Sequence, residues 1–302
     1  MSLSGVLYLS YNTKKREAAG KALFVYGEYS VNYRNMTEAK WALITGSSNG
    51  IGLEISKIMA ADGVNLVIVA RNKDKLEDLQ SLVQEENGVT VLVKVKDLTR
   101  SSSCEELYNE LQEDGIFIEY LVNNAGVGLY GSFYQTDLDR ELDMLDLNIR
   151  SMTHLTKLFL KAMMEKGRGK ILNVASTAAF QPGPMMAVYF ASKAYVLHFS
   201  EALAHEFKGS GVSVTSLCPG PTETAFFVTA DMDSLQLTEG MGKYLLKTAH
   251  SVARAGYRAM KSGKRVAIPG IINKLMALSV RFSPRKMVTR VTGWLTKRAA
   301  GK

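Results

Sequence analysis

The chain has 302 residues, of which 46% are hydrophobic, so it can bury a substantial core and is not expected to be disordered over most of its length. Its two cysteines lie far apart and its four histidines are scattered, which argues against a structural metal and predicts a reduced, cytoplasmic location. The net charge of +8 belongs to the C-terminus, because residues 261–302 hold 11 Lys/Arg and no Asp/Glu, and nucleic acid is therefore not an expected partner of the domain.

Residues 1–39 show no sustained hydrophobic period, so we expect an N-terminal extension that is loosely packed. Short apolar runs then alternate with amphipathic stretches, and the predicted strands are 41–45, 65–70, 89–95, 119–123, 170–176, 212–217 and 265–269. This alternation is typical of β-α-β units in a sheet that helices cover on both faces. Residues 40–270 are therefore predicted to form an α/β domain, a three-layer doubly wound Rossmann fold with a mostly parallel sheet of about seven strands.

A glycine turn follows the first predicted strand in the stretch "TGSSNGIG", which contains Gly46, Gly50 and Gly52 and leads into a helical pattern. A strand, a glycine turn and a helix in this order place backbone N–H groups at a helix N-terminus, where they can bind a pyrophosphate. The glycines let the backbone turn sharply and approach the phosphates without a Cβ in the way. The stretch predicts a dinucleotide-binding site.

The end of the second predicted strand indicates which dinucleotide binds. A carboxylate there would accept the ribose 2′-hydroxyl of NAD, but the sequence reads Ala70, Arg71, Asn72, Lys73 before the first acid, Asp74. A guanidinium suits a 2′-phosphate through charge-assisted contacts. We therefore expect NADP(H) as the preferred cofactor, with NAD(H) as the alternative.

The pattern Y-x-x-x-K occurs three times, as Tyr11/Lys15, Tyr189/Lys193 and Tyr257/Lys261, so its spacing alone identifies nothing. Only the second pair has a distinctive setting. "NNAG" at 123–126 follows the fourth strand, Asn148 lies in the next helix, Ser176 precedes Tyr189 by thirteen positions, and "PGPTET" at 219–224 follows the sixth strand. With the glycine turn, this order resembles the short-chain dehydrogenase/reductase family in its compact single-domain branch. Within the branch the chain is similar to the subgroup of DltE-like proteins and of ketosteroid and 3-ketoacyl reductases.

The resemblance implies a set of site residues. The catalytic residues would be Asn148, Ser176, Tyr189 and Lys193, with Ser176 on the substrate oxygen and Asn148 holding a water in a proton relay. The cofactor would contact Gly46, Ser48, Asn49, Gly50, Ile51, Gly52, Arg71, Asp97, Leu98, Asn124, Ala125, Gly126, Tyr189, Lys193, Pro219, Gly220 and Thr222. The substrate pocket is expected to include Phe180, Met185, Met186, Phe226 and Phe227, although ordinary core packing remains the alternative for these apolar side chains.

The chemistry requires a cation beside the tyrosine. A phenol with a reference pKa of about 10 is a poor acid-base group at neutral pH unless its anion is stabilised, and a lysine one helical turn away can do this. We expect an NADP(H)-dependent oxidoreductase that interconverts an apolar ketone, or a 3-ketoacyl group, and a secondary alcohol. The alternative is a cofactor-binding regulatory or scaffold protein without turnover. The family also implies a homodimer or homotetramer.

Residues 271–302 are predicted to form basic amphipathic helices. Ile271, Leu275, Leu278 and Phe282 follow one helical stripe, Pro284 interrupts it, and Met287, Val291, Trp294 and Leu295 form another. We expect these stripes to pack over the substrate pocket or against a partner subunit. The alternative is peripheral contact with an anionic membrane or an acidic acyl carrier. Neither a membrane span nor a secretory signal is expected from the sequence.

Overall fold

The computed structural model describes residues 25–26, 29–30, 39–224, 226 and 246–297. The chain divides into two units, Met1–Glu38 and Ala39–Lys302. In the first unit the short strands β1 (Val25–Tyr26) and β2 (Tyr29–Ser30) pair in antiparallel fashion. The rest of the expected extension falls almost wholly outside the described residues.

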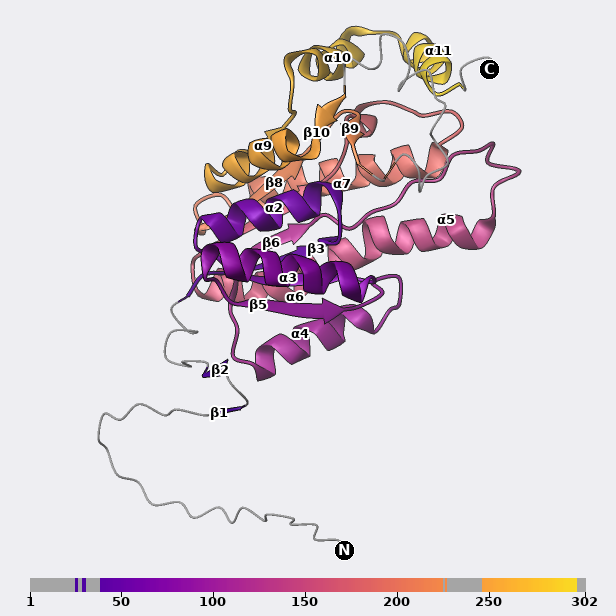
Figure 1. Cartoon of the computed structure of the whole chain (residues 1–302). Coiled ribbons are helices and arrows are strands. Elements are labelled where there is room, and N and C mark those ends of the chain that lie inside the picture. The colour runs from indigo at the N-terminus through magenta and orange to yellow at the C-terminus, as the bar shows by residue number, and fades with distance from the viewer. Residues whose placement is uncertain (1–24, 27–28, 31–38, 225, 227–245, 298–302) are drawn as a thin grey trace, which may run out of the picture. The chain divides into compact units, whose positions relative to one another are not determined.

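A seven-stranded parallel sheet forms the centre of the second unit (Figure 1). Its strands are β3 (Trp41–Thr45), β4 (Asn65–Ala70), β5 (Val91–Val95), β6 (Ile118–Asn123), β7 (Gly169–Val174), β8 (Val212–Leu217) and β11 (Val266–Ala267). They lie in the order β11-β8-β7-β6-β3-β4-β5, and all neighbours are parallel. This confirms the predicted doubly wound α/β fold.

Helices cover both faces of the sheet, so its central strands β3 and β4 are nearly continuous apolar runs, and β3 is buried at every position. The helices are α2 (Gly50–Ala61), α3 (Lys73–Asn87), α4 (Ser103–Glu113), α5 (Leu138–Leu145), α6 (Met152–Glu165), α7 (Ala187–Glu206) and α9 (Ala249–Lys261). Helices α2, α3 and α9 pack on one face, and α4, α6 and α7 pack on the other. The strand order reverses between β3 and β6, which is where such sheets open a crevice at the carboxyl ends of their strands.

A buried amide network joins α7 to the middle of the sheet. The Asn123 Nδ2 of β6 donates to Asn173 Oδ1 of β7 at 2.9 Å and to Thr156 Oγ1 of α6 at 3.0 Å. The Asn173 Nδ2 in turn donates to Ser200 Oγ of α7 at 2.9 Å. Because buried polar groups are costly unless they are paired, these bonds select one position of α7 over the sheet.

Two helices follow the last strand at the carboxyl edge of the sheet, α10 (Ile271–Phe282) and α11 (Arg285–Leu295), seen at the top of Figure 1. Seven of the eight residues in their predicted apolar stripes face away from the domain, so a partner subunit or a membrane is the surface that would cover them. Ile271, Leu275, Leu278, Phe282, Met287, Val291 and Trp294 are each at least 50% exposed, and together they are called the outer face here.

The inward side of these helices is instead made by Asn273 and Ala277 of α10 and by Val288 and Thr292 of α11. The Asn273 side chain donates to the Pro269 carbonyl at 2.8 Å and packs against Gly220, which fixes the face that α10 presents to the domain. Among the described residues, no helix is both long and apolar enough to cross a bilayer.

Candidate active site

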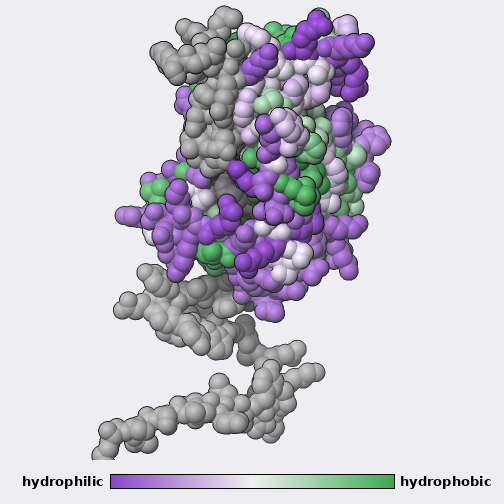
Figure 2. Space-filling model, turned by 90° about the vertical axis from the view of Figure 1, so that its right-hand side faces the viewer, coloured by the Kyte–Doolittle hydropathy of each residue, from purple (hydrophilic) through white to green (hydrophobic). Residues whose placement is uncertain are grey.

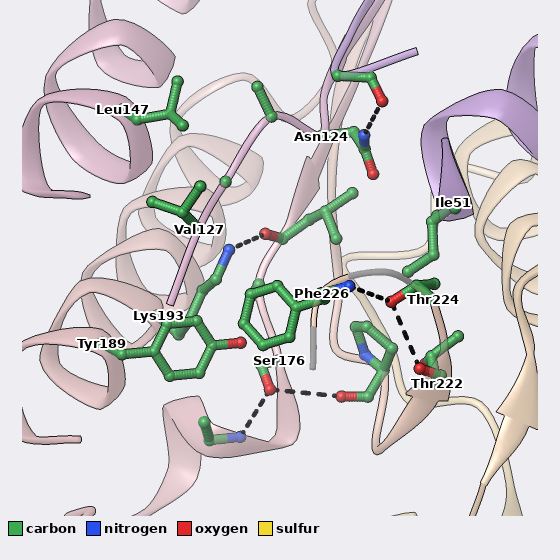
Figure 3. Close-up of a pocket in the computed structure, with 18 of the residues that line it drawn as sticks. Ile51, Asn124, Val127, Leu147, Ser176, Tyr189, Lys193, Thr222, Thr224 and Phe226 are labelled. Carbon is green, nitrogen blue, oxygen red and sulfur yellow. Dashed lines mark hydrogen bonds between the residues drawn. The ribbon is translucent and has the colours of Figure 1, made fainter. Parts of the chain in front are cut away.

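A cavity of about 520 Å³ opens at the carboxyl ends of the central strands (Figure 3). It brings together most of the predicted site residues, which come from seven separate segments of the chain. Its lining includes Gly46, Ser48, Asn49, Gly50, Ile51, Arg71, Asp97, Leu98, Asn124, Ala125, Gly126, Ser176, Met186, Tyr189, Lys193, Pro219, Gly220, Thr222 and Phe226.

Some predicted residues lie elsewhere. Gly52 and Asn148 are buried behind the lining rather than in it. Phe180 lines a neighbouring cavity, because the 3₁₀ turn η2 (Thr177–Phe180) ends there and directs the ring toward the α7 side of the core. Met185, with a φ of 67°, contributes its carbonyl to a bond from Gly131 N at 2.9 Å and lines neither cavity. Phe227 lies outside the described residues.

At its glycine positions, the turn between β3 and α2 has no room for a side chain. Gly46 and Gly50 have φ values of +69° and +60°, in the left-handed region. A Cβ on Gly52 would lie 2.4 Å from both the Gly46 carbonyl oxygen and Asn124 Nδ2. Helix α2 begins at this turn without a side-chain cap and without an acid in its first turn. Its amide groups are therefore available to an anion in the cavity, as a pyrophosphate site requires.

The segment after β6 is tied to the same turn. Thr45 Oγ1 accepts bonds from the amides of Asn124 and Ala125, both at 3.0 Å. The Asn124 Nδ2 donates to the carbonyls of Thr45 at 2.9 Å and Gly46 at 3.2 Å. These bonds hold the cavity walls on either side of the switch point in one register.

Basic groups gather at the end of β4. The exposed Arg71 lines the cavity together with Asn72 and Lys75. Nearby, Asp97 Oδ1 accepts from the Thr99 amide at 3.1 Å and the Thr99 hydroxyl at 2.9 Å. Burial alone would raise the pKa of Asp97, but the bonds from Thr99 and the charge of Arg71 hold that pKa below its usual value. Lys75 was not among the predicted cofactor-binding residues, although the basic residues within 71–75 indicated an anion site there.

Tyr189 and Lys193 lie one turn apart on α7 and are 8% and 5% exposed. The Lys193 Nζ donates to the Val174 carbonyl at the end of β7 at 3.0 Å and lies 5.8 Å from the centre of the Tyr189 ring. Figure 3 shows the phenol oxygen directed toward Ser176, whose Oγ accepts from the Ala178 amide at 3.1 Å and donates to the Pro219 carbonyl at 3.5 Å. Burial raises the pKa of Tyr189 to about 12, against the effect of Ser176, and lowers the pKa of Lys193 to about 8.

Asn148 lies in η1 (Asp146–Ser151), a π-helical segment between α5 and α6. Its Nδ2 donates to the Val127 carbonyl at 2.9 Å and to Ser192 Oγ at 3.1 Å, while its Oδ1 accepts from the Val127 amide at 3.0 Å. A Cβ on Gly126 would lie 3.0 Å from Asn148 Oδ1 and 3.2 Å from Lys193 Nζ. Asn148 thus clamps the chain that runs beside the lysine, and π-helical insertions of this kind are frequent at functional sites.

The other end of the cavity is apolar. The Phe226 ring lies 5.4 Å from the Tyr189 ring, and Met186 and Phe190 pack beside them. Helices α10 and α11, with the residue after α11, add a further wall, as expected for helices that pack over the pocket. It is made by Asn273, Met276, Ala277, Thr292, Leu295 and Thr296, of which only Leu295 belongs to a predicted apolar stripe.

The pair Tyr257/Lys261 has a structural explanation. Both side chains bind the Asp62 carboxylate, the hydroxyl and the ammonium each at 2.8 Å, and so tie α9 to the end of α2. The pair Tyr11/Lys15 lies outside the described residues. Within the described part of the chain no cluster of His, Cys, Asp or Glu could hold a metal ion.

Known proteins share these features. The family model described as short chain dehydrogenase matches residues 40–234. A very-long-chain 3-oxoacyl-CoA reductase of Anas platyrhynchos is 36% identical over 59% of this chain and 58% of its own length. Hydroxysteroid dehydrogenase-like protein 1 of Gallus gallus is 32% identical over 75% of this chain and 67% of its own. The chain therefore spans less than two thirds of the length of the first of these curated relatives.

A solved structure is similar throughout the α/β unit. It is described as a short-chain dehydrogenase from Sphingobium yanoikuyae in complex with NADPH. The two are 30% identical, with a TM-score of 0.72 over 80% of this chain and 93% of the other.

The buried Lys193 predicts a pH-dependent stability. Because its pKa is lowered from 10.5 to about 8, the unfolded chain binds more protons than the folded one between these values, and stability rises with pH there. Lys193→Met removes a desolvation penalty of about 3 kcal/mol at pH 7, offset by a constant amount for the lost bond to Val174. Between pH 7 and pH 9.5, the free energy of unfolding of wild type, measured with urea, should rise by about 2 kcal/mol relative to that of Lys193→Met. A difference that is the same at both pH values would contradict the burial argument.

Proposed function

The chain belongs to the short-chain dehydrogenase family and is an oxidoreductase, and we propose that it uses NADP(H) to interconvert an apolar ketone, or a 3-ketoacyl group, and a secondary alcohol. One observation carries the proposal: the phenol of Tyr189 and the ammonium of Lys193 are buried together at the wall of the cavity, with the phenol oxygen directed toward Ser176. A scaffold protein would need the glycine turn but not this arrangement.

The cavity fits an NADP(H) molecule along its length. The glycine turn and the uncapped N-terminus of α2 suit the pyrophosphate, and Arg71 with Lys75 suits the 2′-phosphate. Asp97 and Leu98 would lie on the adenine side, and Asn124, Ala125 and Gly126 along the middle of the molecule. The similar structure that contains NADPH supports this choice of cofactor.

The bound dinucleotide supplies or accepts the hydride. The residues of this chain handle the proton and the oxygen. Ser176 donates a hydrogen bond to the substrate oxygen, and Tyr189 gives its proton to that oxygen as the carbonyl becomes an alkoxide. In the reverse direction Tyr189 accepts the proton from the alcohol.

The electrostatics suit these roles. With a pKa of about 12, Tyr189 keeps its proton at neutral pH and is ready to act as the acid. Lys193, with a pKa of about 8, remains largely charged at pH 7 and stabilises the phenolate that forms. Asn148 acts as a positioning residue, because it fixes the Val127 backbone and, through Ser192, the turn of α7 that carries Tyr189.

We propose an apolar substrate because the cavity wall around Tyr189 is apolar. Met186, Phe190 and Phe226 surround the Tyr189 ring and offer contacts to hydrocarbon rather than to a charged or hydroxylated molecule. The names of the similar proteins, a 3-oxoacyl-CoA reductase and a hydroxysteroid dehydrogenase-like protein, also describe carbonyl or hydroxyl groups on large apolar bodies.

A homodimer or homotetramer is proposed on the face formed by α5, α6 and α7. Leu138, Leu142, Met164 and Tyr195 on these helices are large, apolar and at least 38% exposed. Burial of such a patch against a second copy would remove it from water. Sedimentation velocity should therefore show a species larger than the monomer. We propose a cytoplasmic location as well, because both cysteines are buried thiols without a disulfide.

Tyr189→Phe is expected to abolish turnover and leave NADPH binding nearly intact, because the change deletes the transferable proton and little else. A general acid typically contributes about 10²- to 10⁴-fold. The measurements are the loss of NADPH absorbance with a panel of ketones and 3-ketoacyl thioesters, and the quenching of protein fluorescence by NADPH.

The matched control for this substitution is Tyr257→Phe, which removes a hydroxyl that binds Asp62; neither residue lines the cavity. It should retain turnover. Full activity in Tyr189→Phe, or an equal loss in both variants, would refute the assignment of Tyr189.

Arg71→Ala is expected to narrow the preference for NADPH over NADH. A charge-assisted contact contributes about 1.5–3 kcal/mol, so the ratio of kcat/KM for the two cofactors should fall by roughly tenfold to a hundredfold. Lys73→Ala is the control, since Lys73 lies two residues on, pairs with Glu77 and does not line the cavity. A wild-type enzyme that prefers NADH would overturn the cofactor assignment.

A further inference from the structure

The outer face of α10 and α11 leaves large apolar side chains in water. Phe282 is 81% exposed, Ile271 75% and Trp294 57%. Exposed apolar side chains are usually scattered singly over a protein surface, and a group of them marks an interaction site. Both helices turn their opposite sides to the same cavity, through Asn273 and Ala277 of α10 and Thr292 of α11. The exposure is therefore a consequence of how the helices are seated on the domain.

The charges around this face have one sign. Lys274, Arg281, Arg285, Lys286 and Arg290 are exposed on the same two helices, and no Asp or Glu occurs between Lys261 and Lys302. None of these five cations forms an ion pair with any carboxylate among the described residues. At the top of Figure 2, at the height where Figure 1 places α10 and α11, hydrophobic and hydrophilic residues adjoin on the surface.

We propose that the outer face of α10 and α11 docks the protein on the surface of an anionic lipid bilayer. Aromatic and aliphatic side chains flanked by cations are the composition that binds at the boundary between headgroups and acyl chains. Trp294 and Phe282 enter this boundary, while the cations remain at the level of the anionic headgroups.

Charge complementarity favours a bilayer over a second copy of the chain. In a two-fold interface the face would meet itself, and cations on one copy would approach cations on the other without a carboxylate to pair them. A planar anionic surface neutralises all of them at once.

The position of the two helices gives the docking a consequence, which rests on the proposed function. The helices that meet the bilayer also form one wall of the cavity, through Met276 of α10 and Leu295 of α11. A lipid-like ketone leaving the bilayer would meet this wall and pass to Tyr189 with little exposure to water. The chemical class of substrate is thus a carbonyl carried on a membrane-soluble hydrocarbon.

Co-sedimentation with vesicles tests the docking without any turnover. The full-length protein is mixed, without cofactor or ketone, with phosphatidylcholine vesicles that contain or lack phosphatidylglycerol. Wild type should bind the anionic vesicles at low ionic strength, bind the neutral ones much more weakly, and be released by salt. Failure to bind anionic vesicles at low salt would overturn the proposal, whereas the tests on Tyr189 and Arg71 would be unaffected.

Charge reversal on the helices locates the surface. The triple substitution Arg281→Glu, Lys286→Glu, Arg290→Glu should weaken partitioning by at least about 100-fold, since the loss of each cation near an anionic surface costs about fivefold and the new carboxylates are repelled as well. The matched control is Lys208→Glu, Lys264→Glu, Arg265→Glu, which changes the net charge equally with exposed residues that precede β8 and β11 at the opposite edge of the sheet. An equal loss in the control would mean that net charge alone drives binding, and the proposal would fall.

A second pair of substitutions tests the apolar contact. Phe282→Ser with Trp294→Ser should reduce vesicle binding about tenfold or more, with an unchanged urea unfolding curve because both side chains are exposed. Sedimentation velocity on the same variant distinguishes a subunit contact. Conversion of an oligomer to a monomer, with vesicle binding unchanged, would show that the outer face binds a second copy and would overturn the proposal.

Discussion

The site depends on a cation held where water hardly reaches. Lys193 is 5% exposed, and its ammonium makes a single bond from this buried position, to the Val174 carbonyl, among the described residues. Keeping a lysine there costs stability, because burial lowers its pKa to about 8. The same burial raises the pKa of the neighbouring Tyr189 phenol to about 12. The surrounding structure tolerates this cost in order to hold the two groups one turn apart, as expected where a site is built for chemistry rather than for stability.

The doubly wound sheet explains why phosphate binding and proton transfer meet in one cavity. The carboxyl ends of β3 and β4 lead to the glycine turn and to Arg71, while those of β6 and β7 lead to Gly126 and Ser176. Since the strand order reverses between β3 and β6, these ends border one crevice. Hydrogen bonds from the amides of Asn124 and Ala125 to Thr45 then join its two sides, and Asn148 clamps the next stretch of chain against α7. Residues far apart in sequence thereby share one frame.

The sequence predicted what depends on local pattern and missed what depends on orientation. Short β-branched and apolar stretches mark buried parallel strands, so β3, β4 and β8 have their predicted bounds, and the glycines Gly46 and Gly52 stand where a Cβ would clash. The stripes on α10 and α11 were visible, but a helical period does not say which side faces the domain, and the contact of Asn273 with Gly220 turns inward the side of α10 opposite its stripe. Met185 has a left-handed backbone with a φ of 67° and does not line the cavity, which the sequence could not show. The clamp made by Asn148 on Val127 is a tertiary contact that no spacing reveals.

Direct titration of the Tyr189 phenol tests the central claim that burial beside Lys193 controls this group. Ultraviolet difference spectra of wild type minus Tyr189→Phe isolate the phenolate signal as pH is raised. Without cofactor the account predicts that Tyr189 remains protonated through pH 10 and titrates toward 12, because burial outweighs the bond from Ser176. Addition of oxidised dinucleotide, whose nicotinamide is cationic, should move the transition to lower pH. A phenol that titrates below pH 10 in the unliganded protein would contradict the account.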